Sequence, residues 1–172
     1  MLRSLFQDWD ANPHDVRIRL VLVGFRLAQW VARAKPALRA VLFPYLAVYR
    51  VLVFWFLHIE LHWTLEVGER LRIYHGYCLV IHPKTRIGKG ITLRHCVTLG
   101  NKAEGGGTPV LEDGVEVGAH VSIIGPITIG RDSIIGAGTV VTKDVPPDAI
   151  VAGNPGKVLH FRSRIGDNSA AL

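Results

Sequence analysis

Eight histidines and two cysteines are the side chains of this 172-residue chain with the most evident chemical potential. Their spacing does not match a closed zinc site, and Cys78 and Cys96 form neither a CxxC motif nor a disulfide framework. So few cysteines favour a reducing, cytosolic compartment. Histidine suits general-base chemistry because its ordinary pKa lies near neutral pH. His75 is a candidate base, and it is followed by Gly76, where the backbone can approach a ligand closely.

A six-residue repeat of aliphatic residues begins near residue 59 and indicates the scaffold that carries His75. The repeat runs through three series, which are Leu61, Val67, Ile73 and Leu79; Ile81, Ile87, Leu93 and Leu99; and Leu111, Val117, Ile123, Ile129, Ile135 and Val141. Three such units close one triangular turn, in which the aliphatic residue points inward and a glycine after it permits the tight corner. The repeat therefore predicts a parallel β-helix over residues 58–160.

Two interruptions of the repeat mark where functional residues are expected. The first is a two-residue shift of phase between Ile73 and Ile81, which predicts a bulge that carries His75. The second is the polar, glycine-rich segment 100–109, which predicts an excluded loop that stands off the β-helix. Loops held by a rigid scaffold are where sites concentrate. His95, about one turn after His75, is expected near the same groove, either as a rival base or as a wall or acceptor contact.

The N-terminal third predicts helices rather than repeats. Asn12 and Pro13 resemble a helix start, with Asn12 as the N-cap and Pro13 at the first helical position. Pro36 is expected to end this helix or to restart a second one that runs to about Leu57. Apolar residues cover most of both helices, so each is expected to expose little surface and to pack within a trimeric assembly. The predicted divisions are a helical segment, a β-helix and a C-terminal tail, at residues 1–57, 58–160 and 161–172.

The formal net charge of +6 belongs mostly to the helical segment. Residues 1–56 hold eight Lys/Arg and three Asp, whereas residues 57–172 hold twelve Lys/Arg and eleven Asp/Glu. A basic chain invites a nucleic-acid interpretation, but the second part is nearly neutral and contains no recognisable nucleic-acid motif, so no nucleic-acid partner is expected. A basic, apolar helical segment fits an anionic membrane surface or an acidic partner. Packing as a cap on the open end of the β-helix fits it equally well.

The apolar stretch from Leu38 to Leu57 has about the length of a membrane span. Arg39, Pro44 and Arg50 interrupt it, and an arginine at the centre of a span costs about 2.5–3.5 kcal/mol. A buried or interfacial helix is therefore favoured over a span. Three Asp in the first fifteen residues argue against a signal peptide. The expected location is the cytoplasm, with peripheral contact at the inner membrane face as an option.

Two segments carry a family resemblance: IYHGYCLVIHPKTRIGKGITLRHCVTLGNK and VEVGAHVSIIGPITIGRDSIIGAGTVVTKDVPPDAIVAGNPGKV. Over about residues 12–160 the chain resembles the hexapeptide-repeat acyltransferases, especially the serine acetyltransferase branch and its shorter relatives in capsular and colanic acid-type exopolysaccharide synthesis. The VPP…NPGKV ending is common to many acetyltransferases of this fold, whereas HGYCLVI and RHCVTLGN are more specific. The resemblance implies a left-handed β-helix, a homotrimer with its sites between subunits, and acetyl-CoA as the acetyl donor, with no metal.

The resemblance also assigns roles to particular residues. In serine acetyltransferases a catalytic histidine sits in the phase-shifted turn and an aspartate fifteen residues earlier supports it; the matching residues here are His75 and Glu60. Such a carboxylate orients the imidazole and stabilises the imidazolium. The implied coenzyme A contacts are backbone groups, small side chains and lysines that could meet a phosphate: Gly100, Asn101, Ala119, Ala137, Lys143 and Lys157.

One departure from the family pattern bears on the acceptor. The histidine that helps bind serine, and the arginine before it, are replaced by Thr108 and Gly107, ahead of Pro109. This loss favours a sugar hydroxyl over serine. The predicted function is an acetyl-CoA-dependent O-acetyltransferase that acts on a sugar of an exopolysaccharide precursor, with serine O-acetyltransferase in cysteine synthesis as the alternative. A non-catalytic β-helix assembly protein, or a carbonic-anhydrase-like relative, is the alternative of another class.

Overall fold

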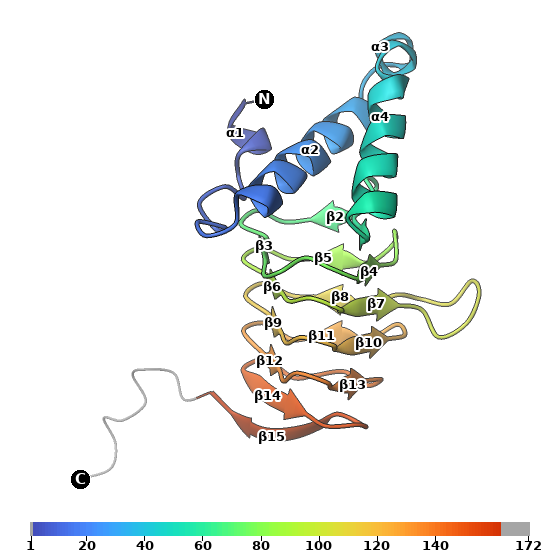
Figure 1. Ribbon diagram of the computed structural model, residues 1–172. Helices are drawn as coiled ribbons and strands as arrows, with labels where there is room; N and C mark the ends of the chain where they lie inside the picture. Colours follow the sequence, from blue (N-terminus) through green and yellow to red (C-terminus); the bar gives the residue numbers. More distant parts are fainter. Residues whose placement is uncertain (1, 163–172) are drawn as a thin grey trace.

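The computed structural model describes residues 2–162 of the chain. Its helices gather at one end of a column of short strands (Figure 1). They are α1 (Leu2–Leu5), α2 (Val16–Ala32), α3 (Pro36–Val41) and α4 (Phe43–Arg50), and α4 continues into a π-helical turn, η1 (Val51–Phe56). Pro36 and Pro44 stand in the first turns of α3 and α4, where the missing backbone N–H has no intrahelical partner to lose. Of the two options predicted at Pro36, the restart is observed, but the second helix is divided at Leu42 into α3 and α4 and is not continuous to about Leu57.

Fifteen short strands follow within the described residues and form three sheets. Sheet A holds β1 (Ile59–Glu60), β4 (Leu79–Ile81), β7 (Thr98–Gly100), β10 (Ser122–Ile124) and β13 (Val140–Val141). Sheet B holds β2 (Glu66–Val67), β5 (Arg86–Ile87), β8 (Val110–Leu111) and β11 (Thr128–Ile129). Sheet C holds β3 (Arg72–Ile73), β6 (Thr92–Leu93), β9 (Glu116–Val117), β12 (Ile134–Ile135), β14 (Ala149–Ala152) and β15 (Lys157–Phe161).

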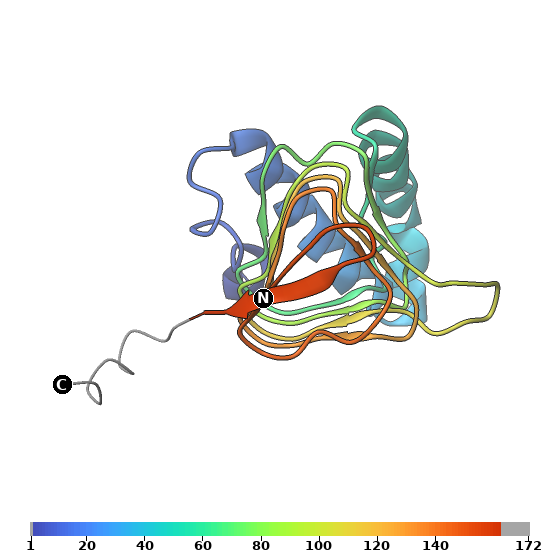
Figure 2. The ribbon, with the colours of Figure 1, turned by 90° about the horizontal axis from the view of Figure 1, so that it is seen from below.

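The chain passes from sheet A to sheet B to sheet C and back to sheet A, once in each turn. Neighbouring strands pair in parallel, apart from β14 and β15, which are antiparallel. Seen along its axis, the column has a triangular outline (Figure 2). The predicted parallel β-helix is confirmed. Of the predicted C-terminal tail, residues 163–172 lie outside the described residues.

The register between turns locates the two interruptions of the repeat. Ile81 pairs with Leu99, as a regular turn of three repeat units requires. Ile73 pairs with Leu93 instead of Ile91, so the corner between β3 and β4 holds two extra residues. Leu99 pairs with Ile123 instead of Val117, so one whole repeat unit leaves the column between β7 and β8. The first irregular segment carries the candidate base, and the second is the glycine-rich loop.

The aliphatic residues of the repeat fill the column. All fourteen predicted inward positions are buried, except Val67, which is half-buried. A second set of buried residues lies two positions before a repeat residue: Ile91, Val97, Val115, Val121, Ile127 and Thr139. The buried apolar side chains form one continuous cluster, and burying each one contributes about 1.5–3 kcal/mol. The column is therefore a rigid support for the residues at its corners.

The first turn of the column has no strand above it in the described chain, and polar side chains from the helical segment bind its backbone instead. The N–H of Leu71 donates to Oδ1 of Asp8 at 2.9 Å, and Arg26 donates to the carbonyl oxygens of Val67 and Gly68 at 3.0 and 2.6 Å. Asp8 and Arg26 also form a buried ion pair, with Nε and Oδ2 2.7 Å apart. Two further side chains donate to first-turn carbonyl oxygens: Gln29 to Leu65 at 2.8 Å and Tyr49 to Leu61 at 2.8 Å. The helical segment thus caps the column.

The start of α2 differs from the prediction. Asp15, not Asn12, is the N-cap, and its Oδ1 accepts a hydrogen bond from the N–H of Ile18 at 3.0 Å. Asn12 is buried against β3: its Nδ2 donates to the carbonyl oxygen of Leu71 at 2.8 Å, and its Oδ1 accepts from the N–H of Ile73 at 2.9 Å. The prediction was wrong because an asparagine amide can satisfy an open strand edge as well as a helix end.

The helices expose more apolar surface than predicted. Phe25 and Leu46 are buried, but Trp55 and Phe56 are 74% and 72% exposed. Only one side of α4 and η1 finds a partner within residues 2–162, so the expectation of little exposed surface is wrong for the described single chain. No helix in the described part of the chain is long and apolar enough to cross a bilayer.

Asp8→Ala should lower the free energy of unfolding by about 3–5 kcal/mol, because it leaves the buried guanidinium of Arg26 without its carboxylate. It also removes the acceptor of the Leu71 N–H. Thermal or denaturant unfolding measures the change. Asp10→Ala, which removes an exposed carboxylate two residues away, is the control. An equal loss of stability in the two variants would contradict the capping role of Asp8.

Candidate active site

Three histidines form a ladder along the corner where sheet C passes into sheet A. His75, His95 and His120 lie on successive turns at this corner. The ring centroids of His75 and His95 are 6.1 Å apart, and those of His95 and His120 are 5.1 Å apart, with both pairs edge to face. The N–H of His120 donates to the carbonyl oxygen of His95 at 3.1 Å, which aligns these two turns. The structure therefore brings the two predicted histidines together and adds a third.

His120 was missed by sequence reasoning, although its spacing carried the signal. Because of the glycine-rich loop, the turn from Leu99 to Ile123 is longer than a regular turn of three repeat units. The separation of His95 and His120 along the sequence is almost equal to the length of this longer turn. His75 and His120 both have a left-handed backbone, with φ values of 59° and 58°. Such φ values are uncommon outside glycine and occur where the chain turns tightly. Two of the three histidines of the ladder therefore lie in tight turns of the backbone.

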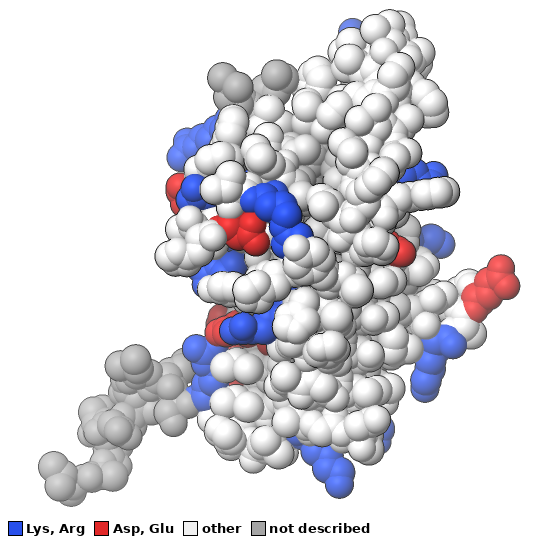
Figure 3. Space-filling view, in the orientation of Figure 1, with Lys and Arg blue, Asp and Glu red and all other residues white. Residues whose placement is uncertain are grey.

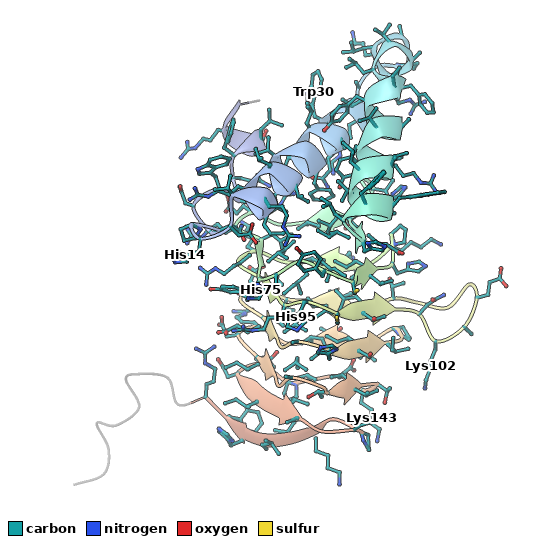
Figure 4. All side chains as sticks on the ribbon, in the orientation of Figure 1. His14, Trp30, His75, His95, Lys102 and Lys143 are labelled. Carbon is teal, nitrogen blue, oxygen red and sulfur yellow. The ribbon has the colours of Figure 1, made fainter. Side chains whose placement is uncertain are left out.

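A small cleft of about 100 Å³ opens beside His75. The column contributes one wall, which includes Tyr74, and the N-terminal segment 11–15 contributes the other, which includes His14. Figure 4 shows His14 and His75 on the same side of the molecule, at the end of the column nearest the helices. Asn12 holds the segment against β3, so the capping contacts also shape the cleft. The repeat pattern could not predict this wall, because it comes from outside the repeat.

Glu60 lies on the outward face of sheet A, where it pairs with Val80 of the next turn. Its side chain is exposed. No hydrogen bond joins Glu60 to His75 within residues 2–162. His75 stands at the corner from which the chain enters the same sheet, so the two side chains border one surface. The support of His75 by Glu60 stays a prediction.

His95 offers an unpaired polar atom at the middle of the ladder. Its Nδ1 is buried and has no hydrogen-bond partner among the residues that the structure describes. Buried polar atoms are nearly always paired in native proteins, so this nitrogen is a group that a bound substrate would satisfy. The imidazole of His75 is exposed, whereas that of His95 is half-buried between its two neighbours. This difference favours His75 as the base and His95 as a substrate contact.

Cys78 and Cys96 lie on neighbouring turns beside the ladder, and both thiols are free. The N–H of Cys96 donates to the carbonyl oxygen of Tyr77 at 2.8 Å. Partial burial, followed by the neighbouring thiol of Cys78, raises the pKa of Cys96 above its ordinary value. The Cys96 thiol therefore stays protonated at neutral pH and is a weak nucleophile. Among residues 2–162, no group of three or more His, Cys, Asp and Glu is placed to hold a metal ion.

Small residues continue the same corner beyond the ladder. Ala119 and Ala137, two of the predicted coenzyme A contacts, follow β9 and β12. A Cβ on Gly118 would lie 2.6 Å from the backbone nitrogen of Ala137, so no side chain fits between these turns. The two turns therefore stack closely at this corner, and contact of Ala119 and Ala137 with coenzyme A stays a prediction.

The other predicted coenzyme A contacts lie at a different corner. Gly100 and Asn101 begin the glycine-rich loop, where sheet A passes into sheet B, and Lys143 follows β13 at the same corner. Figure 4 shows Lys102 of the loop and Lys143 on one side of the column and His75 on the other. Within one chain, the structure does not bring the two groups of residues together.

Lys143 shares a cleft of about 210 Å³ with Lys157, at the end of the column far from the helices. The cleft lies between β13 and the strands β14 and β15, and Asp144 also lines it. Two ammonium groups on one cleft fit a phosphate group. The contact of these lysines with a phosphate of coenzyme A stays a prediction.

Comparison with known proteins identifies the family. Residues 108–143 match the family described as bacterial transferase hexapeptide (six repeats). The chain is 35% identical over 158 residues to WcaB of Escherichia coli K12, which is named as an acetyltransferase of colanic acid biosynthesis, and the match covers 90% of this chain and 98% of WcaB. The chain belongs to the hexapeptide-repeat acetyltransferases. The β-helix of this acetyltransferase is accordingly of the left-handed kind, as predicted.

Serine acetyltransferases are further relatives of this hexapeptide-repeat acetyltransferase. The Mycobacterium tuberculosis enzyme is 42% identical over 103 residues, which cover 59% of this chain and 45% of that enzyme. The solved structure of the Neisseria gonorrhoeae enzyme has a TM-score of 0.68 and 31% identity, over 92% of this chain and 56% of that one. The Brucella abortus enzyme in complex with coenzyme A has a TM-score of 0.74 and 26% identity, over 94% of this chain and 68% of that one.

His75→Ala should lower kcat for acetyl transfer by about 10²–10⁴-fold with little change in the affinity for acetyl-CoA, because general-base catalysis contributes that much. Glu60→Gln should cost less, because this carboxylate is predicted to orient the imidazole rather than to react. Steady-state kinetics measure both effects, and His160→Ala, at an exposed position on β15, is the control. If His95→Ala is the severe variant and His75→Ala the mild one, then His95 is the base.

Proposed function

We propose that this protein is an acetyl-CoA-dependent O-acetyltransferase that modifies a sugar hydroxyl on an exopolysaccharide precursor. The observation that carries the proposal is the His75 corner, where an exposed imidazole stands beside a cleft on a hexapeptide-repeat scaffold. The name of the E. coli relative, matched over nearly its whole length, supports an exopolysaccharide precursor as the acceptor. The Brucella abortus complex supports coenzyme A as the carrier of the acetyl group.

In this proposal the chain's own residues account for the movement of one proton. His75 accepts the proton of a sugar hydroxyl that lies in the cleft, and the hydroxyl oxygen attacks the carbonyl carbon of the thioester. Glu60 orients the imidazole and stabilises the imidazolium. When the tetrahedral intermediate collapses, the carbon–sulfur bond breaks and the departing thiolate takes the proton from His75. The Nδ1 atom of His95 pairs with the acceptor, and the backbone groups of Gly100 and Asn101 near the thioester come from a neighbouring column of the proposed trimer.

Two residues of the glycine-rich loop favour a sugar over serine as the acceptor. Thr108 stands where serine acetyltransferases have a serine-binding histidine, and its hydroxyl already donates to the carbonyl oxygen of Lys84 at 3.0 Å. A Cβ on Gly107 would lie 2.6 Å from the Cβ of Pro126, so an arginine could not stand there unless the loop moved. Neither position supplies a cation for an amino-acid carboxylate, whereas a sugar hydroxyl needs only hydrogen-bond partners. Serine acetylation is the second candidate, supported by the serine acetyltransferase relatives.

The proposed active unit is a homotrimer with each site between two subunits. The histidine ladder and the glycine-rich loop occupy different corners of one column, and the rigid core does not let one chain bring them together. Placing the loop corner of one column beside the ladder corner of another would complete a site. The proposed location is the cytoplasm, which agrees with two neighbouring cysteines that remain free thiols.

Release of free thiol from acetyl-CoA should depend on a sugar acceptor. We expect turnover with a lipid-linked oligosaccharide or a related sugar in a panel of acceptors, and much slower turnover with serine, because the loop offers serine no cation. Mass spectrometry of the product should show one added acetyl group on the sugar. Faster turnover with serine than with every sugar would establish the second candidate instead.

The assembly should have about three times the 19.0 kDa mass of the chain. The physical reason is that the two halves of the proposed site lie at two separate corners of a single column. A complete site therefore needs the ladder corner of one column and the loop corner of another. Multi-angle light scattering at several concentrations measures the mass. A mass near 19.0 kDa for a catalytically active protein would contradict the shared site.

A further inference from the structure

The helical end of the molecule carries an apolar surface that the described chain leaves uncovered. We call it the tip surface, and it consists of exposed side chains of α3, α4 and η1: Leu38, Val41, Phe43, Val48, Val51, Leu52, Trp55 and Phe56. Their exposed fractions run from 43% at Leu38 to 74% at Trp55. In the view of Figure 3, the surface over α3 and α4 is almost entirely white, with few Lys, Arg, Asp or Glu side chains. A contiguous exposed apolar surface of this extent marks an interaction site.

The tip surface is distinct from the face that packs on the column. On α4 and η1 the buried residues Leu46, Tyr49 and Val53 are spaced three and four apart, so they form one stripe that faces inward. Val48 and Leu52 lie on the outward side, where a surface helix normally carries polar residues. This helix therefore has two apolar sides, and residues 2–162 bury only one of them.

Positive charge borders the tip surface. From residue 16 to residue 59 the sequence contains seven Lys/Arg and no Asp or Glu. Three of these cations are exposed around α3 and α4: Lys35, Arg39 and Arg50. No ion pair within residues 2–162 engages them. The segment therefore presents an apolar, aromatic area edged by uncompensated cations.

This combination fits the headgroup region of an anionic bilayer better than it fits a second copy of the chain. Aromatic residues such as Trp55 favour the membrane interface, and Lys and Arg favour anionic headgroups. Two tip surfaces that met each other would bring Arg39 and Arg50 close to their like-charged copies, and the segment has no carboxylate to pair with them. Since no helix of the described chain can span a bilayer, such contact would be peripheral.

We propose that the tip surface docks the enzyme on an anionic lipid bilayer, with Trp55 and Phe56 in the headgroup region and Arg39 and Arg50 against anionic headgroups. The docking does not depend on the identity of the acceptor.

Vesicle flotation with the full-length protein tests the docking. We expect the protein to float with vesicles that contain phosphatidylglycerol, to stay behind with pure phosphatidylcholine, and to be released in about 0.5 M salt, where screening is strong. Phe43→Ser/Trp55→Ser should lower the floated fraction at least about tenfold, because it removes two aromatic side chains from the interface. Leu159→Ser/Phe161→Ser removes two apolar side chains that are 62% and 56% exposed on β15, and this matched control should float like the unaltered protein.

A second pair of variants tests the charges. Arg39→Gln/Arg50→Gln should weaken binding to the anionic vesicles, whereas Arg70→Gln/Lys84→Gln, which removes two exposed cations of the column, should not. Circular dichroism and light scattering check that each variant keeps its fold and assembly.

Four results would overturn the docking. The first three are no flotation with either kind of vesicle, equal flotation with neutral and anionic vesicles, and an equal loss of the floated fraction in a control variant. The fourth is a fall in the mass of the assembly in Phe43→Ser/Trp55→Ser, which would assign the tip surface to contact with a second copy of the chain. Acetyl transfer to a soluble acceptor fragment should be the same in the tip variants and the unaltered protein. Failure of docking and failure of the proposed function are therefore separate outcomes.

Discussion

The open end of the β-helix, at its first turn, is the constraint on which this fold depends. The first turn of a β-helix has backbone groups with no strand above them, and each one left buried and unpaired would cost about 1–3 kcal/mol. Here the side chains of Asp8, Asn12 and Arg26 take the place of the missing strand. The buried Asp8–Arg26 pair would itself be costly if either charge stood alone, but both partners also bind first-turn backbone. The helical segment therefore completes the hydrogen bonding of the first turn of the column.

The same contacts determine the geometry beside His75. Asn12 binds β3 just before the chain reaches the histidine corner, and in doing so it holds segment 11–15 as one wall of the cleft. The opposite wall belongs to the column, whose position is fixed by strand pairing and by the aliphatic core. The contacts that stabilise the first turn therefore also determine the shape of the cleft beside His75.

The column could be predicted because its signal lies in the spacing of residues along the chain. A period of six identified the inward positions, and departures from that period located the bulge at His75 and the loop. The cap could not be predicted in the same way, because Asn12 suits both a helix end and a strand edge, and the choice depends on Leu71 and Ile73, far along the chain. His120 was missed because the glycine-rich loop lengthens its turn beyond the regular interval. His14 was missed because it reaches the cleft from outside the repeat.

A single column pairs its buried backbone groups within the chain, but it leaves some apolar and charged side chains exposed. Unpaired backbone at the open end would be costly, so the chain pairs it internally. Exposed apolar side chains and surface lysines cost a folded chain little, so the tip surface and the two half-sites can persist unpartnered in a single column. The aliphatic core fills the column, and the strands of sheet A lie between the histidine ladder and the loop. In the proposed active unit the columns stand side by side, so that the loop corner of one column completes the ladder corner of another, and the proposed trimer follows from this separation of the two corners.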